Sequence, residues 1–421
     1  MVHSLVNSGF KFESSVFNLS RPSCNYSSFS NFHTPEIGPL RNSFIPNRFF
    51  TLHKNMGGVP YSSRFGTALG SKPLNGHAHA TGGPLIVART KPADTKLIVC
   101  VWHPFPQWRA DEMMPAAIRK RWPEMRVVHL PDYDRLPEEV PDTDIFVGAS
   151  IRPDQFALAK KLKWIHSTAA GVNQLMYPAL KNSGVLVTNP SGLFSPGMAE
   201  HVIGMMVLLA RNFMDSVRYQ DKHIWAQNEV SSIPGEITEL SGELLLIVGY
   251  GSIGREVARR ANCFDMRIWG MTRSGKGDAS LVDKILPISE LDAALPHADW
   301  VVLAAPETHD TQKLFGPERF ARMKRGARLI NMGRGTILDE DAFVAALNSG
   351  DIRGAAIDVA TTEPIPPDSP LWTAKNLFIT PHTAGVSDRL WRRQTEILME
   401  LLERWFDHQE MFNVVDVSAG Y

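Results

Sequence analysis

Short apolar runs alternate with helical segments from residue 96 onward. This alternation predicts parallel strands whose connecting helices cover both faces of a sheet. One long helix, from 196 to about 225 with Ser195 as its N-cap, separates two groups of strands. The first group is expected at 96–102, 126–130, 144–147, 163–166 and 185–188, and the second at 244–248, 266–270, 299–304, 328–332, 355–359 and 377–380. A last helix is expected at 390–406.

The first 92 residues have a different composition. They hold 13 serines, few acids and no sustained apolar periodicity, and we interpret them as disordered. A serine-rich, acid-poor segment is typical of an organelle transit peptide. An unstructured extension, or a start assigned too early with Met56 nearer the true one, explains the composition equally well. The segment lacks the compact apolar stretch of a secretory signal, so secretion is not expected.

Charge and cysteine content exclude several classes of protein. Residues 1–90 hold 8 of the 44 Lys and Arg but only 2 of the 44 Asp and Glu, so the rest of the chain carries a net charge of −6. An acidic body does not suit a nucleic-acid partner, and the apolar run 202–210 is too short to span a membrane. The three cysteines are far apart, which predicts a reducing compartment and no metal site. We expect a soluble intracellular protein, cytoplasmic or in an organelle stroma or matrix if residues 1–92 are a transit peptide.

A glycine-rich turn follows the expected strand 244–248. Its pattern is G-x-G-x-x-G, and a helical pattern comes directly after it. In such a turn the first glycine permits the bend, the second lets the backbone approach a pyrophosphate, and the third lets helix and strand pack closely. A βα turn without a ligand is the alternative. We expect the turn to bind a dinucleotide through Gly249, Tyr250, Gly251, Ser252, Ile253 and Gly254.

The residues after the next strand bear on the choice of dinucleotide. NAD sites usually place Asp or Glu there for the ribose 2′-hydroxyl, but this chain has Met271 and Thr272. Arg273 and Ser274 follow and suit a 2′-phosphate, so NADP(H) is favoured over NAD(H). The alternative is that Arg273 is simply solvated and either cofactor binds. Asp278 is a weaker candidate for an acidic partner.

Reactive side chains follow three later strands, at the edge where open α/β sheets bind ligands. Arg334 lies beside glycines and could grip a carboxylate with two parallel hydrogen bonds. Asp358 closes an apolar strand, and Glu363 precedes a proline that holds it extended. His382 follows Pro381 and suits general acid–base chemistry if a carboxylate lies beside it. Taken singly, each has an ordinary structural explanation, such as a surface arginine or a solvated carboxylate.

The order of these motifs resembles that of one enzyme family. G-x-G-x-x-G is followed by Ile-Asn-Met-Gly-Arg-Gly, Asp-Val-x-x-x-Glu-Pro and Thr-Pro-His-Thr-Ala-Gly, and the segment 189–201 adds a further match. The chain from about Thr95 to its C-terminus is similar to the D-isomer-specific 2-hydroxyacid dehydrogenases. The resemblance implies a fold of two Rossmann-like, doubly wound parallel-sheet α/β domains, with the dinucleotide-binding domain inserted in the substrate domain. The implied boundaries are 1–92 for the extension, 93–195 and 381–421 for the substrate domain, and 196–380 for the dinucleotide domain.

The resemblance also implies site residues and a partner. It implies Arg334, Glu363 and His382 as catalytic residues, with Arg334 binding the substrate. Backbone N–H groups of Ala170 and Gly171 would bind the substrate carboxylate. Asp358 would contact the nicotinamide carboxamide, and a homodimer is expected through the long helix after Ser195. Pro306 and Gly385 are further expected cofactor contacts.

The expected reaction is reversible hydride transfer between NAD(P)H and a 2-oxo acid. Residues 167–174 contain no Lys or Arg, which favours an unphosphorylated acid such as glyoxylate, hydroxypyruvate or a bulkier one. Ala360 and Asp265 depart from the family pattern and leave the substrate and cofactor preferences open. Alternatives are a dinucleotide-sensing binding protein of corepressor type and a phosphoglycerate dehydrogenase without its regulatory domain; the Glu363/His382 pair disfavours a formate dehydrogenase. Trp102 and Trp391 could line a pocket, but core or interface packing is the simpler expectation.

Overall fold

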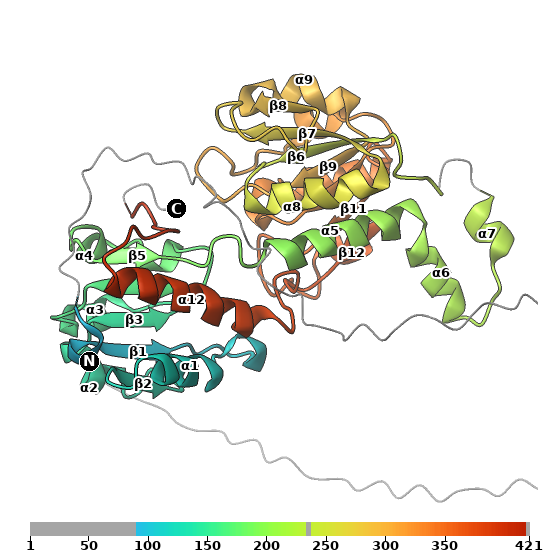
Figure 1. Ribbon diagram of the computed structural model, residues 1–421. Coiled ribbons are helices and arrows are strands. Elements are labelled where there is room, and N and C mark those ends of the chain that lie inside the picture. The colour runs from blue at the N-terminus through green and yellow to red at the C-terminus, as the bar shows by residue number, and fades with distance from the viewer. Residues whose placement is uncertain (1–89, 233–236, 418–421) are drawn as a thin grey trace, which may run out of the picture. The chain divides into compact units, whose positions relative to one another are not determined.

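The computed structural model describes residues 90–232 and 237–417, and these form two parallel sheets (Figure 1). The expectation for residues 1–92 falls almost wholly outside the described ranges. Every strand pair in both sheets is parallel. The predicted class, two parallel-sheet α/β units, is confirmed. The domain boundaries given above remain a prediction.

The first sheet has five strands in the order β2-β1-β3-β4-β5. One face is covered by α1 and by α12 from the C-terminal end of the chain, where Trp405 stacks on Trp164 with ring centroids 5.3 Å apart. The other face packs against α2, α3 and α4. The elements are β1 (Lys96–Cys100), α1 (Met113–Arg121), β2 (Arg126–Leu130), α2 (Leu136–Glu139), β3 (Ile145–Gly148), α3 (Pro153–Leu158), β4 (Trp164–Ser167), α4 (Pro178–Lys181), β5 (Leu186–Thr188) and α12 (Leu390–Phe406).

The second sheet has seven strands in the order β12-β11-β10-β9-β6-β7-β8. Helices α5 and α8 pack on one face, and α9, α10 and α11 on the other. The strand order reverses beside β6, which is where sheets of this kind bind ligands. The elements are α5 (Ser195–Ala210), α6 (Phe213–Gln220), α7 (Gln227–Ser231), β6 (Leu244–Val248), α8 (Ser252–Ala261), β7 (Arg267–Thr272), β8 (Lys284–Pro287), α9 (Leu291–Ala294), β9 (Trp300–Leu303), α10 (Pro317–Arg322), β10 (Arg328–Asn331), α11 (Glu340–Ser349), β11 (Gly354–Ile357) and β12 (Leu377–Ile379).

Three local expectations were wrong. The long helix ends at Ala210, because Asn212 adopts a left-handed conformation with φ 52° that stops it, and the helical path resumes as α6. Ser195 lies within the first turn of α5, and Phe194 occupies the N-cap position without a capping side chain. Strand β8 was missed, since it is a short edge strand that begins with an exposed lysine and ends in proline.

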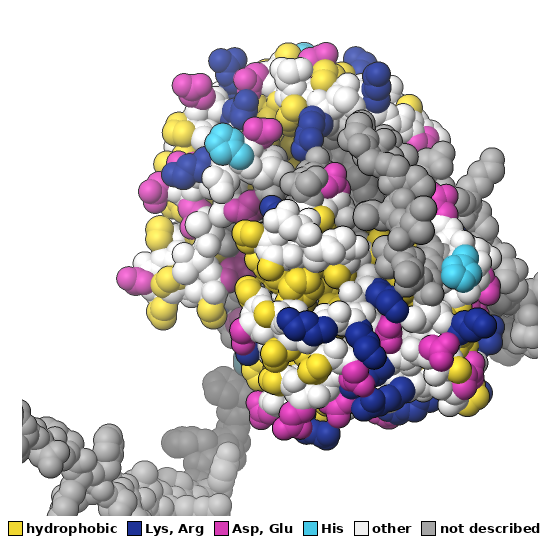
Figure 2. Space-filling view, turned by 90° about the vertical axis from the view of Figure 1, so that its left-hand side faces the viewer, with side chains coloured by type: hydrophobic (Ala, Val, Ile, Leu, Met, Phe, Trp, Pro, Cys, Tyr) yellow, Lys and Arg dark blue, Asp and Glu magenta, His cyan; other side chains and the backbone are white. Residues whose placement is uncertain are grey.

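The surface of the described residues mixes charges of both signs. On the face drawn in Figure 2, basic and acidic side chains are interspersed with hydrophobic ones. No helix in residues 90–232 and 237–417 is long and apolar enough to cross a bilayer.

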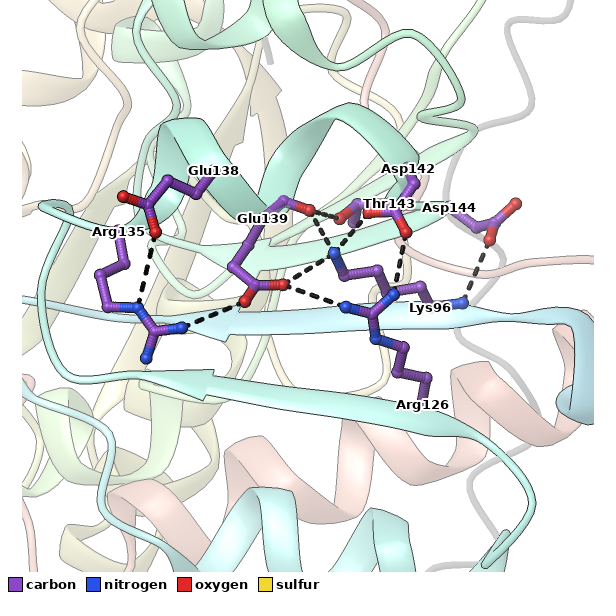
Figure 3. A network of polar contacts seen from close by, with 8 residues as sticks. All are labelled: Lys96, Arg126, Arg135, Glu138, Glu139, Asp142, Thr143 and Asp144. Atoms are coloured by element: carbon purple, nitrogen blue, oxygen red, sulfur yellow. Dashed lines mark hydrogen bonds and ion pairs between the residues drawn. The ribbon is translucent and has the colours of Figure 1, made fainter.

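A buried lysine at the start of β1 organises a polar network (Figure 3). Lys96 is 5% exposed, and its ammonium group contacts the carboxylates of Glu139, at 2.8 Å, and Asp142. Arg126 binds Asp142 at 2.9 Å from the solvent side, and Arg135 reaches Glu139 at 3.3 Å. The hydrogen bond from Lys96 holds the pKa of both carboxyl groups below their usual values. The network therefore ties the α2 region to β1.

Removing this lysine should destabilise the fold at neutral pH. We expect Lys96→Met to lower the free energy of unfolding by about 2 kcal/mol at pH 7, since hydrogen bonds to charged groups are lost. A carboxyl group with a depressed folded pKa stabilises the fold above its unfolded pKa, about 4, and that contribution disappears as pH falls through the folded value. The difference between wild type and variant should therefore begin to shrink below about pH 5 and keep shrinking as pH falls through the lowered pKa values of the two carboxyl groups. Urea unfolding at several pH values measures both effects.

The matched control removes Arg135, an exposed cation that contacts the same Glu139 carboxylate. Arg135 is 67% exposed in its side chain, so Arg135→Met should cost less than about 0.5 kcal/mol. Equal losses in the two variants would contradict the role given to burial of Lys96.

Candidate functional site

The glycine turn has the shape that a pyrophosphate needs. A Cβ added at Gly249, where φ is +100°, would lie 2.5 Å from the Ala305 nitrogen, and one at Gly254 would lie 2.6 Å from the Gly249 oxygen. A Cβ at Gly251 would meet nothing within 4 Å. The first and third glycines are therefore required for packing, whereas the second leaves open space in front of α8. Gly251 is the N-cap of this ten-residue helix and has no capping side chain, so the turn fits an anionic group at the helix N-terminus.

The other residues of the turn lie in different environments. Ser252 and Ile253 form the half-buried first turn of α8. The Tyr250 ring packs in the core, because Gly270 leaves room for it: a Cβ there would lie 2.7 Å from the ring. Burial, together with nearby Asp278, raises the pKa of Tyr250. The backbone of Tyr250, rather than its ring, is thus what the turn presents. Pro306 is exposed in the loop after β9, next to the Ala305 that packs on Gly249.

The end of β7 carries cations and hydroxyls rather than an acid. Thr272 is half-buried and donates from its hydroxyl to the Lys276 carbonyl at 3.1 Å, which closes a short turn. Arg273 and Ser274 are exposed on this turn. Lys276, which the sequence reasoning passed over, adds a second exposed cation to it. Lys276 could have been found from the sequence, because it lies only four residues past Thr272.

Alanine substitutions should separate packing from cofactor binding at this turn. We expect Gly251→Ala to change the free energy of unfolding by less than about 1 kcal/mol, yet to weaken NADPH binding at least tenfold by filling the open space. Gly249→Ala should destabilise the fold by more than about 2 kcal/mol, because both the positive φ and the contact with Ala305 oppose it. Thermal melts and fluorescence titration with NADPH report the two effects. Wild-type affinity in Gly251→Ala would contradict this assignment.

Arg334 follows β10 and is succeeded by Gly335, a position where no side chain would fit. A Cβ at Gly335 would lie 1.9 Å from the Ala360 carbonyl carbon, so the loops after β10 and β11 are in direct contact. Asn331 fixes the turn by donating to the Arg334 carbonyl at 2.9 Å. The guanidinium donates to the Gly333 carbonyl at 2.7 Å and lies 3.0 Å from where a Gly171 Cβ would be. Arg334 therefore reaches from the second sheet to a loop of the first.

His382 and Glu363 form the predicted pair. The Nδ1 atom of His382 lies 2.7 Å from Oε2 of Glu363, and the two side chains are 53% and 37% exposed. The other carboxylate oxygen of Glu363 accepts from the Ala360 N–H at 2.9 Å, which orients the carboxylate. With Nδ1 held by the carboxylate, Nε2 is the ring nitrogen left to exchange a proton with a ligand.

Asp358 anchors the loop that carries His382. It is 3% exposed, and its oxygens accept hydrogen bonds from the Thr380 hydroxyl and from the N–H groups of Thr383 at 2.9 Å and Ala384 at 3.0 Å. His201 on α5 lies 3.0 Å from the same hydroxyl. Sequence reasoning missed this anchoring, because three segments that are separate in sequence make it. The expected contact between Asp358 and nicotinamide stays a prediction.

The loop after β4 has its carbonyl groups hydrogen-bonded and, within the described part of the chain, some of its N–H groups free, as a site for a carboxylate requires. Its carbonyl groups are engaged: Gln394 donates to the Thr168 oxygen at 2.6 Å, and Asn189 donates to the Ala170 oxygen at 2.9 Å. Within residues 90–232 and 237–417, the N–H groups of Ala170 and Gly171 have no acceptor. They are therefore available to an anionic ligand, and the expected contact with a substrate carboxylate stays a prediction.

One cavity of about 320 Å³ brings these groups together. Its lining includes Ala170, Gly171, Arg334, Asp358, His382 and Gly385. Trp102 and Trp391 also line it, so neither is confined to core packing. Sequence reasoning missed Trp108 and Gln394, which no motif marks, and did not single out Phe194 within the matched segment 189–201. In the part of the chain that the structure describes, no three His, Cys, Asp or Glu side chains gather as a metal-binding group.

Known proteins are similar to this chain in sequence. The profile of the family "D-isomer specific 2-hydroxyacid dehydrogenase, NAD binding domain" matches residues 203–384. A putative 2-hydroxyacid dehydrogenase of Haemophilus influenzae is 36% identical over 258 residues, which are 60% of this chain and 80% of that protein. The chain belongs to the D-isomer-specific 2-hydroxyacid dehydrogenase family.

Other members of this family match over similar lengths. The glyoxylate reductase of Korarchaeum cryptofilum is 34% identical over 272 residues, 63% of this chain and 80% of that protein. The crystal structure of the NADPH-dependent glyoxylate/hydroxypyruvate reductase of Sinorhizobium meliloti, in complex with NADP and sulfate, superimposes with a TM-score of 0.66. It is 27% identical and covers 78% of this chain and all of its own. Members of the family bind NAD(P) and are oxidoreductases, so this 2-hydroxyacid dehydrogenase is an NAD(P)-dependent oxidoreductase acting on CH–OH groups.

Proposed function

We propose that the protein reduces a 2-oxo acid to a D-2-hydroxy acid, and oxidises the product in reverse, with Arg334, Glu363 and His382 as its catalytic residues. The Glu363–His382 pair carries this proposal, because it provides a proton donor held by a carboxylate on the same cavity as a guanidinium. An enzyme whose reaction transfers a hydride but no proton would not require such a pair. The proposal also includes the domain boundaries 93–195 with 381–421, and 196–380.

Each residue has a distinct task in the reductive direction. The N–H groups of Ala170 and Gly171 bind the substrate carboxylate, and Arg334 binds the carboxylate and the C2 carbonyl oxygen, which it polarises. The bound nicotinamide supplies a hydride to C2. As the carbonyl π pair moves to oxygen, His382 donates its Nε2 proton to that oxygen and forms the hydroxyl. Glu363 stabilises the protonated ring before the transfer, and in the oxidative direction His382 accepts the proton.

We favour NADP(H) as the cofactor. The end of β7 offers no carboxylate to a ribose 2′-hydroxyl, since Met271 is buried and Thr272 turns its hydroxyl to the Lys276 carbonyl. Arg273, Ser274 and Lys276 form an exposed cationic turn that suits a 2′-phosphate. The Sinorhizobium relative, named as NADPH-dependent, supports this choice. NAD(H) is the alternative.

A homodimer completes the proposal. Helix α6, which follows α5, and the segment after it carry exposed apolar side chains: Phe213 is 47%, Val217 56% and Trp225 92% exposed. A second copy would cover this surface. Sedimentation of the full chain should give twice the mass of 46.9 kDa.

A panel of 2-oxo acids tests the proposed reaction. We expect the full chain to oxidise NADPH in the presence of at least one of glyoxylate, hydroxypyruvate or a bulkier 2-oxo acid, and kcat/KM with NADPH to exceed that with NADH. Absorbance at the reduced nicotinamide band follows the reaction. NADPH binding without turnover of any acid would instead favour a dinucleotide-sensing role.

A further inference from the structure

Four aromatic side chains form one wall of the cavity. Trp102 and Trp108 come from the segment after β1, Phe194 precedes α5, and Trp391 lies at the start of α12. The Trp108 and Phe194 ring centroids are 6.2 Å apart. A Cβ added at Gly385 would lie 3.5 Å from the Trp108 ring and 3.3 Å from the Phe194 ring. The wall therefore adjoins the loop that carries His382.

Hydrogen bonds hold this wall in place without a ligand. The Trp391 indole N–H donates to the Gln107 carbonyl at 3.1 Å, which ties α12 to the segment after β1. Arg109 donates to the carbonyls of His103, at 2.6 Å, and Pro104, at 3.1 Å, while its guanidinium lies 5.7 Å from the Trp102 ring centroid. A surface held in its binding shape loses little conformational entropy when a ligand arrives.

The wall offers nothing to a charged substrate side chain. In residues 90–232 and 237–417, the cavity lining contains no Lys and no Arg other than Arg334, which the substrate carboxylate engages. The Nδ1 atom of His103 accepts from the Phe105 N–H at 3.1 Å. A phosphate or second carboxylate placed here would lose its hydration without gaining a cation. An uncharged, flat side chain would instead bury apolar area against four rings.

Building on the proposed reduction of 2-oxo acids, we infer that the substrate carries an aromatic side chain at C3, which packs against the surface that Trp108 and Phe194 form together. Arg334 and the N–H groups of Ala170 and Gly171 take the carboxylate end, so the side chain extends toward the wall. Glyoxylate has no side chain and leaves these contacts unused. The substrate class is therefore that of aryl-substituted 2-oxo acids such as phenylpyruvate.

Steady-state kinetics with four acids test this inference. The full chain is assayed with NADPH and phenylpyruvate, glyoxylate, hydroxypyruvate or 3-phosphohydroxypyruvate. We expect kcat/KM for phenylpyruvate to exceed that for glyoxylate at least tenfold and the phosphorylated acid to be the poorest substrate. Trp108→Leu should lower the ratio of phenylpyruvate to glyoxylate kcat/KM by about 10- to 100-fold, mainly through KM. Trp108→Phe should retain most of the ratio, since it keeps a ring in the wall.

The control variant changes a tryptophan elsewhere. Trp372 is 52% exposed and does not line the cavity, so Trp372→Leu should leave the ratio unchanged. A wild-type preference for glyoxylate, or for the phosphorylated acid, would overturn the aromatic assignment and leave the proposed reaction intact. An unchanged ratio in Trp108→Leu would do the same. Failure to reduce any of the four acids would overturn the proposed reaction as well.

Discussion

Replacing His382 with alanine is expected to lower kcat by about 10²- to 10⁴-fold while the Kd for NADPH stays within about threefold of wild type. The reason is geometric. His382, the proposed proton donor, lines the cavity and is held by Glu363 at 2.7 Å, whereas the glycine turn that fits the cofactor is formed by a different loop. Stopped-flow reduction of the preferred 2-oxo acid gives kcat, and fluorescence titration gives the Kd.

A second histidine provides the matched control. His408 also adopts a left-handed conformation, with φ 56° against 54° for His382, but it is exposed after α12 and outside the cavity. His408→Ala should retain wild-type kcat. If His382→Ala turned over at the wild-type rate, His382 would not be the proton donor.

Arg334→Lys is expected to reduce kcat/KM by about 10²- to 10³-fold although the positive charge is kept. A guanidinium can donate to a carboxylate and a carbonyl oxygen together through a planar fork, which an ammonium group on a flexible chain cannot reproduce. The loss should appear in KM for the 2-oxo acid as well as in kcat, because in the proposed mechanism the same guanidinium binds the substrate and polarises its carbonyl. Initial rates over a range of acid concentrations separate the two.

An arginine on the same sheet controls for general effects of the change. Arg325 is exposed in the turn before β10 and does not line the cavity, so Arg325→Lys should leave kcat/KM unchanged. Kinetics of Arg334→Lys equal to wild type would show that charge alone suffices and that the fork is not used.

The strands were predictable because each is a local signal. Buried parallel strands are covered on both faces, so runs such as Leu244–Val248 and Trp300–Leu303 are apolar throughout. The same reasoning fails at edges and breaks. Strand β8 has no fully buried residue and begins with an exposed lysine, and the end of α5 depends on one left-handed residue, Asn212, that composition does not reveal.

The candidate site shows the same division. Arg334, Glu363 and His382 each follow a strand within a recognisable motif, so their meeting at one edge of the sheet could be expected. The cavity wall could be expected only in part: Trp102 and Trp391 were possible pocket residues, but the wall is assembled from segments far apart in sequence, and nothing singled out Trp108 or Phe194. Asp358 was expected to face the cofactor, but its anchoring of the His382 loop appears only once β11 and β12 are paired in register.

The contact between His201 and Thr380, at 3.0 Å, has an evolutionary consequence. It joins the second turn of α5 to the residue that follows β12, so the segment of about 180 residues between them starts and finishes at one place. A module whose ends meet can be gained by a host gene, or exchanged for a homologous copy, without altering the path of the host chain on either side. Recombination at these two points would therefore transfer the whole glycine turn and its cofactor preference while leaving the carboxylate loop and the aromatic wall of residues 102–108 with the recipient.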